Sequence, residues 1–185
     1  GLVYHYLGDH ETARDYSRRA LELAQEMGER RSQGAMWLKL GHALAGLGQL
    51  DAAADAYRRS VALRREIGMP GPVTESLAGL AWVCLAHGDL EQAQAHIEEI
   101  LAHLTAGGTL DGTISPFQVY LTCFHVLEAT HDLRAQGILD TAHDLLQARA
   151  ARIGDETMRR SFLEEVAAHR ALVRAFERRR ARVGA

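Results

Sequence analysis

Three side chains that can bind a metal ion follow one another along a single predicted helix. His96, Glu99 and His103 lie at positions i, i+3 and i+7, which places them on one face of the helix. Imidazole nitrogen and carboxylate oxygen are donors that zinc sites use. However, neither an H-E-x-x-H nor a C-x-x-C pattern occurs in the sequence. We therefore expect solvated or hydrogen-bonded histidines, with no metal ion and no other cofactor.

Catalytic chemistry finds no support in the residue pattern. A G-x-S-x-G elbow, a phosphate-binding loop and the protein-kinase motifs are all missing from the sequence. Carboxylates do occur close together, as in Asp140 with Asp144 and Glu164 with Glu165. We interpret these pairs as solvated charges on helix surfaces. The sequence therefore predicts a protein that is not an enzyme.

Arginines gather near the C-terminus of the chain. They are Arg170, Arg174, Arg178, Arg179, Arg180 and Arg182. Such a tail can contact the phosphates of nucleic acid. We favour the alternative, a solvated helix face whose positive charges complement the helix dipole. The net charge of the whole chain is −3, which gives no general electrostatic argument for a nucleic-acid or membrane partner.

The two cysteines and the lack of long apolar runs bear on location. Cys84 and Cys123 both fall on apolar helical stripes, so we expect buried thiols. Two cysteines without a secretory context fit a reducing cytoplasm. No apolar run approaches the roughly 18 residues of a membrane span. We therefore expect a cytoplasmic protein that makes no contact with a membrane.

The composition and the residue pattern predict that helices position the residues named above. Alanine, leucine, arginine and glutamate dominate the composition and favour helix, and only three prolines occur among the 185 residues. No stretch alternates with a period of two, so we expect no sheet. From Trp37 to Leu63, apolar residues recur at three- and four-residue steps, and Gly48-Gln49 interrupts them. This pattern predicts two antiparallel helices joined by a tight turn.

The same two-helix unit recurs along the chain. Gly8, Gly48 and Gly88 are spaced by 40 residues. Each glycine is followed five residues later by an alanine, namely Ala13, Ala53 and Ala93. A fixed period of this length indicates helical hairpins that stack on one another.

The repeated residues resemble the tetratricopeptide repeat. The W-x-x-L-G-x-x-L pattern from Trp37 to Leu44, the L-G pair at Leu47-Gly48, Ala53 and Tyr57 follow the motif of that family. Ser60 replaces a usual small alanine, the terminal proline is missing, and the period exceeds the usual one of about 34 residues. Longer variants of this kind are typical of large bacterial signalling ATPases and transcription activators.

The resemblance implies an all-α fold, a right-handed superhelix of antiparallel helix pairs with a C-terminal capping helix. We expect one domain over residues 1–185 that is a fragment of a longer protein. Its parts are a partial first repeat (1–28), a second repeat (31–68), a third (72–104), a divergent fourth (116–153) and the capping segment (155–183). We expect a mobile loop from Thr105 to Ser115, and a capping segment that is one long helix or two with a bend near Ala167.

In a stack of this kind the first helix of each pair lines a concave groove. By register the expected groove residues are Tyr6, Leu38, Lys39, His42, Glu75, Trp82, Leu85 and His125. An alternative is that Leu38, Trp82 and Leu85 are ordinary core residues. Some family members grip a C-terminal carboxylate in the groove, but only Lys39 and His42 are candidates here and the chain has no asparagine. We do not expect that clamp.

The function that the resemblance implies is non-catalytic, as the interaction or sensor region of a larger bacterial signalling or transcription regulator. The expected partners are a protein or peptide segment in the groove, other domains of the parent protein, or a second copy of the chain through the truncated N-terminal face. The alternative is a domain that senses a small-molecule inducer, in which Trp82 stacks on the ligand and His42 forms a hydrogen bond to it.

Overall fold

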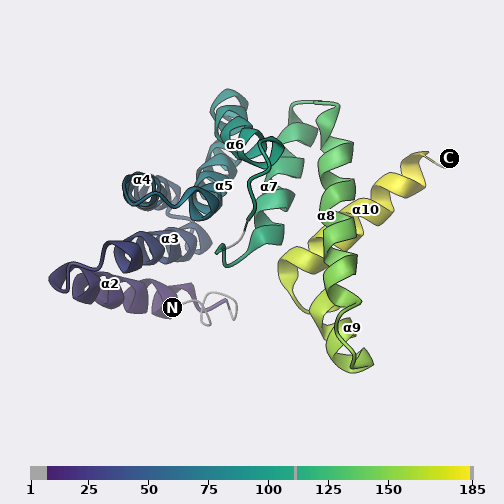
Figure 1. Cartoon of the computed structure of the whole chain (residues 1–185). Helices are drawn as coiled ribbons and strands as arrows, with labels where there is room; N and C mark the ends of the chain where they lie inside the picture. The colour runs from purple at the N-terminus through teal and green to yellow at the C-terminus, as the bar shows by residue number, and fades with distance from the viewer. Residues whose placement is uncertain (1–7, 111, 184–185) are drawn as a thin grey trace. The chain divides into compact units, whose positions relative to one another are not determined.

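The computed structural model describes residues 8–110 and 112–183, and over these residues the chain folds into nine α-helices without a strand (Figure 1). The helices are α2 (His10–Glu26), α3 (Arg30–Gly46), α4 (Leu50–Glu66), α5 (Pro70–His87), α6 (Leu90–Thr105), α7 (Pro116–Ala129), α8 (Arg134–Ala150), α9 (Glu156–Glu164) and α10 (Ala167–Val183). None of these described helices is both long enough and apolar enough to cross a membrane. The expected all-α helical-repeat fold is confirmed.

The chain divides into two compact units, each with its own core. Residues 1–114 form the first, which we call the repeat unit, and residues 115–185 form the second, which we call the C-terminal unit. The repeat unit contains α2 to α6, and the C-terminal unit contains α7 to α10. The assignment of all 185 residues to one domain stays a prediction.

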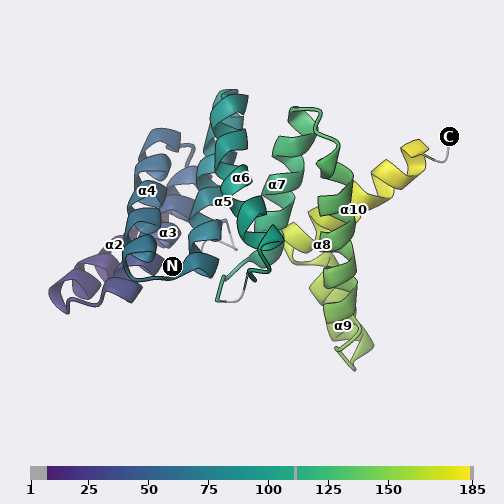
Figure 2. The ribbon, with the colours of Figure 1, turned by 45° about the horizontal axis from the view of Figure 1, so that its top comes forward.

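Each helix of the repeat unit packs against the next one along the chain (Figure 2). Helices α3 and α4 form the pair expected over residues 31–68, and α5 and α6 form the pair expected over 72–104. Helix α3 also contacts α5. Of the two cysteines expected to be buried, Cys123 is fully buried and Cys84 is only partly buried.

Glycines end the helices of the repeat unit at a spacing of 20 residues. Gly28, Gly48, Gly68 and Gly88 all have positive φ angles, between 67° and 77°. At Gly48 the N–H donates to the Ala45 carbonyl (3.0 Å), and the N–H of Gln49 donates to the Leu44 carbonyl (2.9 Å). Glycine adopts this left-handed conformation without the clash of a Cβ atom. The tight turn predicted at Gly48-Gln49 is present for this reason.

The ring of Tyr57 joins three helices of the repeat unit. Tyr57 lies on α4 and is 2% exposed. A Cβ atom at Gly41 on α3 would lie 2.5 Å from Cε1 of Tyr57, and a Cβ atom at Gly79 on α5 would lie 2.6 Å from the same carbon. The ring therefore lies directly against two helix backbones, and glycine is the residue that leaves room for it. Burial raises the pKa of Tyr57, and the nearby charge of Glu75 adds to this effect.

A chain of buried hydrogen bonds crosses the same three helices. Arg64 on α4 donates to the Pro72 carbonyl and to Oγ of Ser76 (3.2 Å). Ser76 donates to Oγ of Ser60 (2.8 Å), and Ser60 donates to the Gly34 carbonyl on α3 (2.7 Å). The side chains of Arg64, Ser60 and Ser76 are all buried. Ser60 stands where the repeat motif usually has alanine, and this hydrogen-bond chain gives its hydroxyl a role.

In the C-terminal unit, the turn between α7 and α8 has the geometry of the glycine turns without a glycine. His131 has a φ of 56°, the only positive value at a non-glycine position among the described residues. Its N–H donates to the Glu128 carbonyl (3.2 Å), and the N–H of Asp132 donates to the Leu127 carbonyl (2.8 Å). This is the hydrogen-bond pattern of the turn at Gly48. The divergent fourth pair therefore keeps the turn although it has lost the L-G signature.

The capping segment forms two helices. Helix α9 ends at Glu164 and α10 begins at Ala167, so the second of the two expected alternatives, a bend near Ala167, describes the structure. Helix α10 packs against both α7 and α8. Leu172 and Ala175 of α10 are buried.

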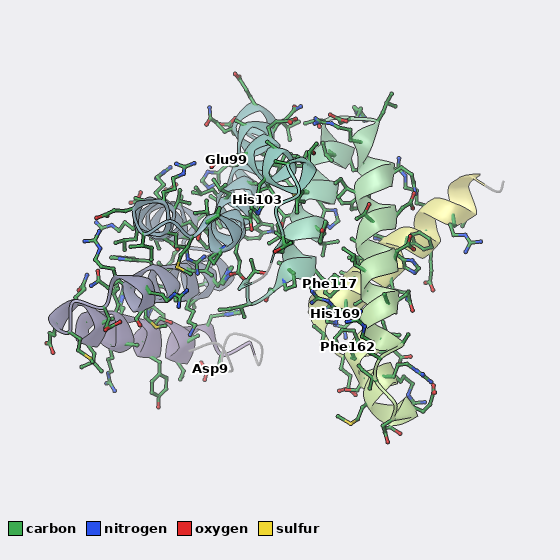
Figure 3. All side chains as sticks on the ribbon, viewed as in Figure 1. Asp9, Glu99, His103, Phe117, Phe162 and His169 are labelled. Atoms are coloured by element: carbon green, nitrogen blue, oxygen red, sulfur yellow. The ribbon has the colours of Figure 1, made fainter. Side chains whose placement is uncertain are left out.

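Aromatic rings from three helices meet where α9 turns into α10 (Figure 3). The ring of His169 on α10 lies 4.9 Å from that of Phe117 on α7 and 4.4 Å from that of Phe162 on α9, measured between ring centroids. Nδ1 of His169 lies 2.8 Å from the Phe162 carbonyl oxygen. Burial lowers the pKa of His169, although the hydrogen bond to Phe162 opposes the shift. These contacts connect α7, α9 and α10 at the turn between α9 and α10.

Candidate partner-binding surface

Four of the expected groove residues lie at the surface of the repeat unit. Lys39 and His42 come from α3, and Trp82 and Leu85 come from α5. Their side chains are at least partly exposed, and Trp82 has the largest exposed fraction, 40%. The two helices that carry them are in contact. We call these four residues the α3–α5 surface.

Trp82 is the first exposed residue after a long buried run on α5. Every residue of α5 from Gly71 to Ala81 is buried, as is typical of a helix that is covered on all sides. Trp82 follows at once and is exposed, and Leu85 one turn later is partly exposed. A large indole side chain at this boundary is held by the core on one side and is open to solvent on the other.

The buried Tyr57 contacts His42 and orients its ring. Its Nδ1 lies 2.9 Å from the Tyr57 hydroxyl. The two rings meet edge to face, with centroids 5.5 Å apart and planes at 68°, which is a favourable arrangement for aromatic rings. The packing core of the repeat unit therefore fixes the orientation of one residue on the α3–α5 surface.

Two of the expected groove residues are buried, which corrects the sequence-based register at these positions. Leu38 is 0% exposed and Glu75 is 3% exposed. Leu38 therefore belongs to the core, as the alternative interpretation allowed. Oε1 of Glu75 accepts a hydrogen bond from the Ile114 N–H (2.9 Å), and Oε2 lies 3.9 Å from Nη1 of Arg64. Burial lowers the pKa of Arg64, and the charge of Glu75 opposes that shift.

The loop after α6, which was expected to be mobile, is held against the repeat unit. Ile114 is bound to Glu75 as described above. Leu110 is buried, and both the N–H and the hydroxyl of Thr113 donate to the Leu110 carbonyl (3.1 and 2.6 Å). Pro72 on α5 lies 3.6 Å from where a Cβ atom of Gly112 would be. These contacts cover the first half of α5 and leave Trp82 at its exposed end.

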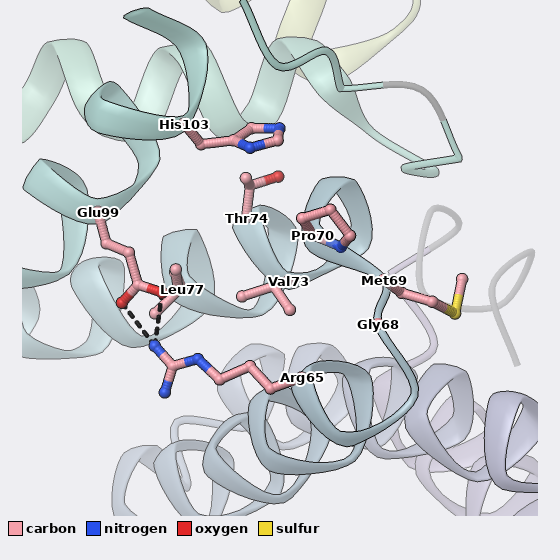
Figure 4. Close-up of a pocket in the computed structure, with 9 residues that line it drawn as sticks. All are labelled: Arg65, Gly68, Met69, Pro70, Val73, Thr74, Leu77, Glu99 and His103. Atoms are coloured by element: carbon pink, nitrogen blue, oxygen red, sulfur yellow. Dashed lines mark hydrogen bonds and ion pairs between the residues drawn. The ribbon is translucent and has the colours of Figure 1, made fainter. Parts of the chain in front are cut away.

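A hollow of about 230 Å³ lies beside the turn between α4 and α5 (Figure 4). Its apolar lining includes Val73 and Leu77, and Arg65 and Glu99 form an ion pair along one side at 2.5 and 2.6 Å. Nε2 of His103 lies 3.0 Å from the Thr109 carbonyl oxygen. Two of the three residues weighed as metal ligands thus have protein partners. Over the described residues no group of three or more His, Cys, Asp or Glu side chains is arranged to hold a metal ion.

Comparison with known families agrees with this arrangement of paired helices. Residues 1–66 and 32–106 match the tetratricopeptide repeat, so the matches together cover more than half of the chain. The chain belongs to the tetratricopeptide repeat family. Repeats of this family generally mediate protein–protein interaction. No curated protein matches the chain.

Solved structures share the tetratricopeptide repeat fold at low sequence identity. Two are of Podosopora anserina proteins with nearly identical TPR-like repeats, named for kinesin light chain, and one of these carries a single substitution. Each is 15% identical to this chain with a TM-score of 0.59, and the alignments cover 98% and 97% of this chain and 91% of the other. BtubC (BKLC) from P. vanneervenii is 20% identical over 98% of this chain and 77% of its own, with a TM-score of 0.62.

The last expected groove residue, His125, lies in the C-terminal unit, beyond the matched tetratricopeptide repeats. It is half-buried on α7 and lines a hollow together with Arg170, Arg174 and Arg178 of α10. The remaining one, Tyr6, lies outside the described residues. Arg170, Arg174 and Arg178 are exposed, as expected for a solvated helix face, and the packing of α10 on α7 places them along a hollow that the sequence did not predict.

Proposed function

We propose that this chain is a non-catalytic interaction module of a larger bacterial signalling or transcription regulator, and that it binds a protein or peptide segment across the α3–α5 surface. Membership of the tetratricopeptide repeat family supports an interaction role in general. The exposed Trp82, which directly follows the buried run of α5 from Gly71 to Ala81, is the observation that supports this particular surface. A cytoplasmic location is part of the proposal.

Burial of Trp82 by a partner supplies useful binding energy. A tryptophan side chain has about 250 Å² of surface, and Trp82 is 40% exposed, so about 100 Å² is available. At about 25 cal/mol per Å², covering this area contributes about 2.5 kcal/mol. The indole has only two side-chain torsions, so little conformational freedom is lost when it becomes ordered. Interface hot spots are rich in tryptophan for these reasons.

Polar groups on α3 give the surface directionality. The ammonium group of Lys39 offers three donors, and the ring of His42 is already oriented by Tyr57. A partner that matches both features places an apolar side chain on Trp82 and an acceptor, such as a carboxylate or a backbone carbonyl, near α3. Preorganisation of His42 and Trp82 lowers the ordering cost of binding.

The test is a selection of peptides from a random displayed library against the whole chain. The affinity of each selected peptide is then measured for the wild-type chain, for Trp82→Ala and for Tyr16→Ala. Tyr16 is the matched control because it is an aromatic residue, 49% exposed, on another helix of the repeat unit.

We expect Trp82→Ala to weaken binding at least tenfold, with an upper limit of about 70-fold that corresponds to 2.5 kcal/mol. Tyr16→Ala should change the affinity less than twofold. The proposed surface would be contradicted if the selected peptides bound Trp82→Ala as tightly as the wild type. It would also be contradicted if Tyr16→Ala weakened their binding as much as Trp82→Ala does.

A further inference from the structure

We propose that the hollow between α7 and α10 in the C-terminal unit binds a compact phosphate-bearing small molecule with more than one negative charge. The hollow measures about 270 Å³ and is lined by His125 of α7 and by Ala167, Arg170, Ala171, Arg174 and Arg178 of α10. This inference goes beyond the proposed peptide-binding function, because none of these residues belongs to the repeat unit.

The α10 side of the hollow follows one helical stripe. Arg170, Arg174 and Arg178 are four residues apart, so they lie above one another along one face at intervals of about 6 Å. Ala167 and Ala171 lie on the same face, and their small side chains leave open space beside the arginine stems. The side chains of all three arginines therefore line one volume.

Among the described residues, none of the three arginines forms an ion pair with a carboxylate. Arg170 donates to the Glu164 carbonyl (2.8 Å). Within the described part of the chain, no carboxylate forms an ion pair with Arg174 or Arg178, and Glu128, the acid beside His125, lies 3.7 Å from Arg179 instead. Arginines at this spacing repel one another. A phosphate group placed between them removes that repulsion, and its oxygens match the paired donors of a guanidinium.

His125 completes the polar lining without adding charge at neutral pH. Burial lowers its pKa, while Glu128 opposes the shift and Arg178 adds to it. The neutral imidazole has one donor and one acceptor nitrogen. It can therefore accept a hydrogen bond from a phosphate hydroxyl or donate one to a phosphate oxygen. A guanidinium group can only donate.

Size and charge distribution favour a compact anion over a long polyanion. The volume of about 270 Å³ lies near the lower end of the range for small-molecule sites, about 300–1,000 Å³. Helix α10 has six arginines and one glutamate, whereas the whole chain has a net charge of −3. The remainder of the chain is therefore acidic, and it would repel a nucleic acid that extended beyond α10.

The test is calorimetric titration of the whole chain with inorganic pyrophosphate, at an ionic strength held constant with sodium chloride. The wild-type chain is compared with the double variant Arg174→Gln/Arg178→Gln. The control is Arg152→Gln/Arg160→Gln, which removes the same charge from two exposed arginines of the C-terminal unit outside the hollow. Thermal melts establish that each variant is folded, and the single variants Arg174→Gln and Arg178→Gln replace the double variant if it melts early.

We expect saturable binding of one pyrophosphate per chain, a loss of at least tenfold in affinity in the double variant, and a change below twofold in the control. Trp82→Ala should bind pyrophosphate as the wild type does, so this test can fail while the peptide proposal stands. The proposal is overturned if the wild type shows no saturable binding or if the control loses as much affinity. A single-stranded oligonucleotide that binds more tightly than pyrophosphate would equally overturn it, in favour of a nucleic-acid surface.

Discussion

Replacement of Gly79 by alanine tests the packing of Tyr57 between two helix backbones. In most helix interiors, Gly→Ala stabilises a protein by about 1 kcal/mol because alanine favours helix. Here the new Cβ atom would lie 2.6 Å from Cε1 of Tyr57, whereas carbon atoms in contact are normally separated by about 3.5–4.0 Å. The substitution therefore needs the ring to move by close to 1 Å.

The ring cannot move away from α5 without approaching α3. On its other side the backbone of α3 is so close that a Cβ atom at Gly41 would lie 2.5 Å from the same carbon, and the Tyr57 hydroxyl is held by His42. Overpacking of this kind costs about 1–3 kcal/mol. With about 3 kcal/mol of overpacking and about 1 kcal/mol of gain from helix propensity, we expect Gly79→Ala to destabilise the repeat unit by about 2 kcal/mol.

The assay is urea denaturation of four proteins, namely the wild type, Gly79→Ala, Tyr57→Val and the double variant. Valine lacks every ring atom that the new methyl group would meet. In the Tyr57→Val background we therefore expect Gly79→Ala to stabilise the protein by about 1 kcal/mol, which gives a coupling of about 3 kcal/mol between the two positions.

Gly137→Ala on α8 is the control, since nothing lies within 4 Å of its added Cβ atom, and it should stabilise the protein by about 1 kcal/mol. Additive effects of the two substitutions at positions 57 and 79, or stabilisation by Gly79→Ala in the wild type, would refute the packing argument.

Three further predictions concern a buried charge, a strained turn and a half-buried histidine. Glu75→Gln leaves the buried charge of Arg64 without its carboxylate, so urea denaturation should show a loss of about 3 kcal/mol in the repeat unit; an unchanged midpoint would contradict it. His131→Gly relieves a left-handed residue and should stabilise the C-terminal unit by about 1 kcal/mol, whereas a lower melting temperature would count against strain at this turn. The pKa of His169 is lowered in the folded state, so on acidification the histidine of the unfolded chain is protonated first. The contribution of the neutral His169 to stability is therefore fully present above about pH 6.5, and it is lost as the pH falls through the folded-state pKa. His169→Gln should reduce this decline in melts between about pH 7 and pH 5, and an unchanged pH dependence would contradict the assignment.

The helical hairpins could be predicted from the sequence because their signals are local. The steps of three and four residues from Trp37 onward, and the glycine at Gly48, each act within one or two helical turns. Gly41 and Tyr57 both belong to the repeat motif, and the structure places the Tyr57 ring directly against Gly41. Local residue spacing was therefore enough to predict the paired helices and their turns.

The candidate surface could be predicted only in part because burial depends on distant segments. Leu38 and Glu75 have the register of groove residues, yet Glu75 is covered by Ile114 from a loop 39 residues further along. Nothing in the helix pattern of α5 indicates where that loop lies. In the same way, the arginine stripe of α10 becomes the wall of a hollow only because α10 packs against α7.

Binding at the α3–α5 surface requires that a partner covers Trp82. Because the chain has two tryptophans, Trp37→Phe makes Trp82 the sole indole fluorophore, and acrylamide quenching then reports its exposure with and without a selected peptide. We predict that the quenching constant falls at least twofold when the peptide is bound. An unchanged constant at saturating peptide would contradict binding at the α3–α5 surface.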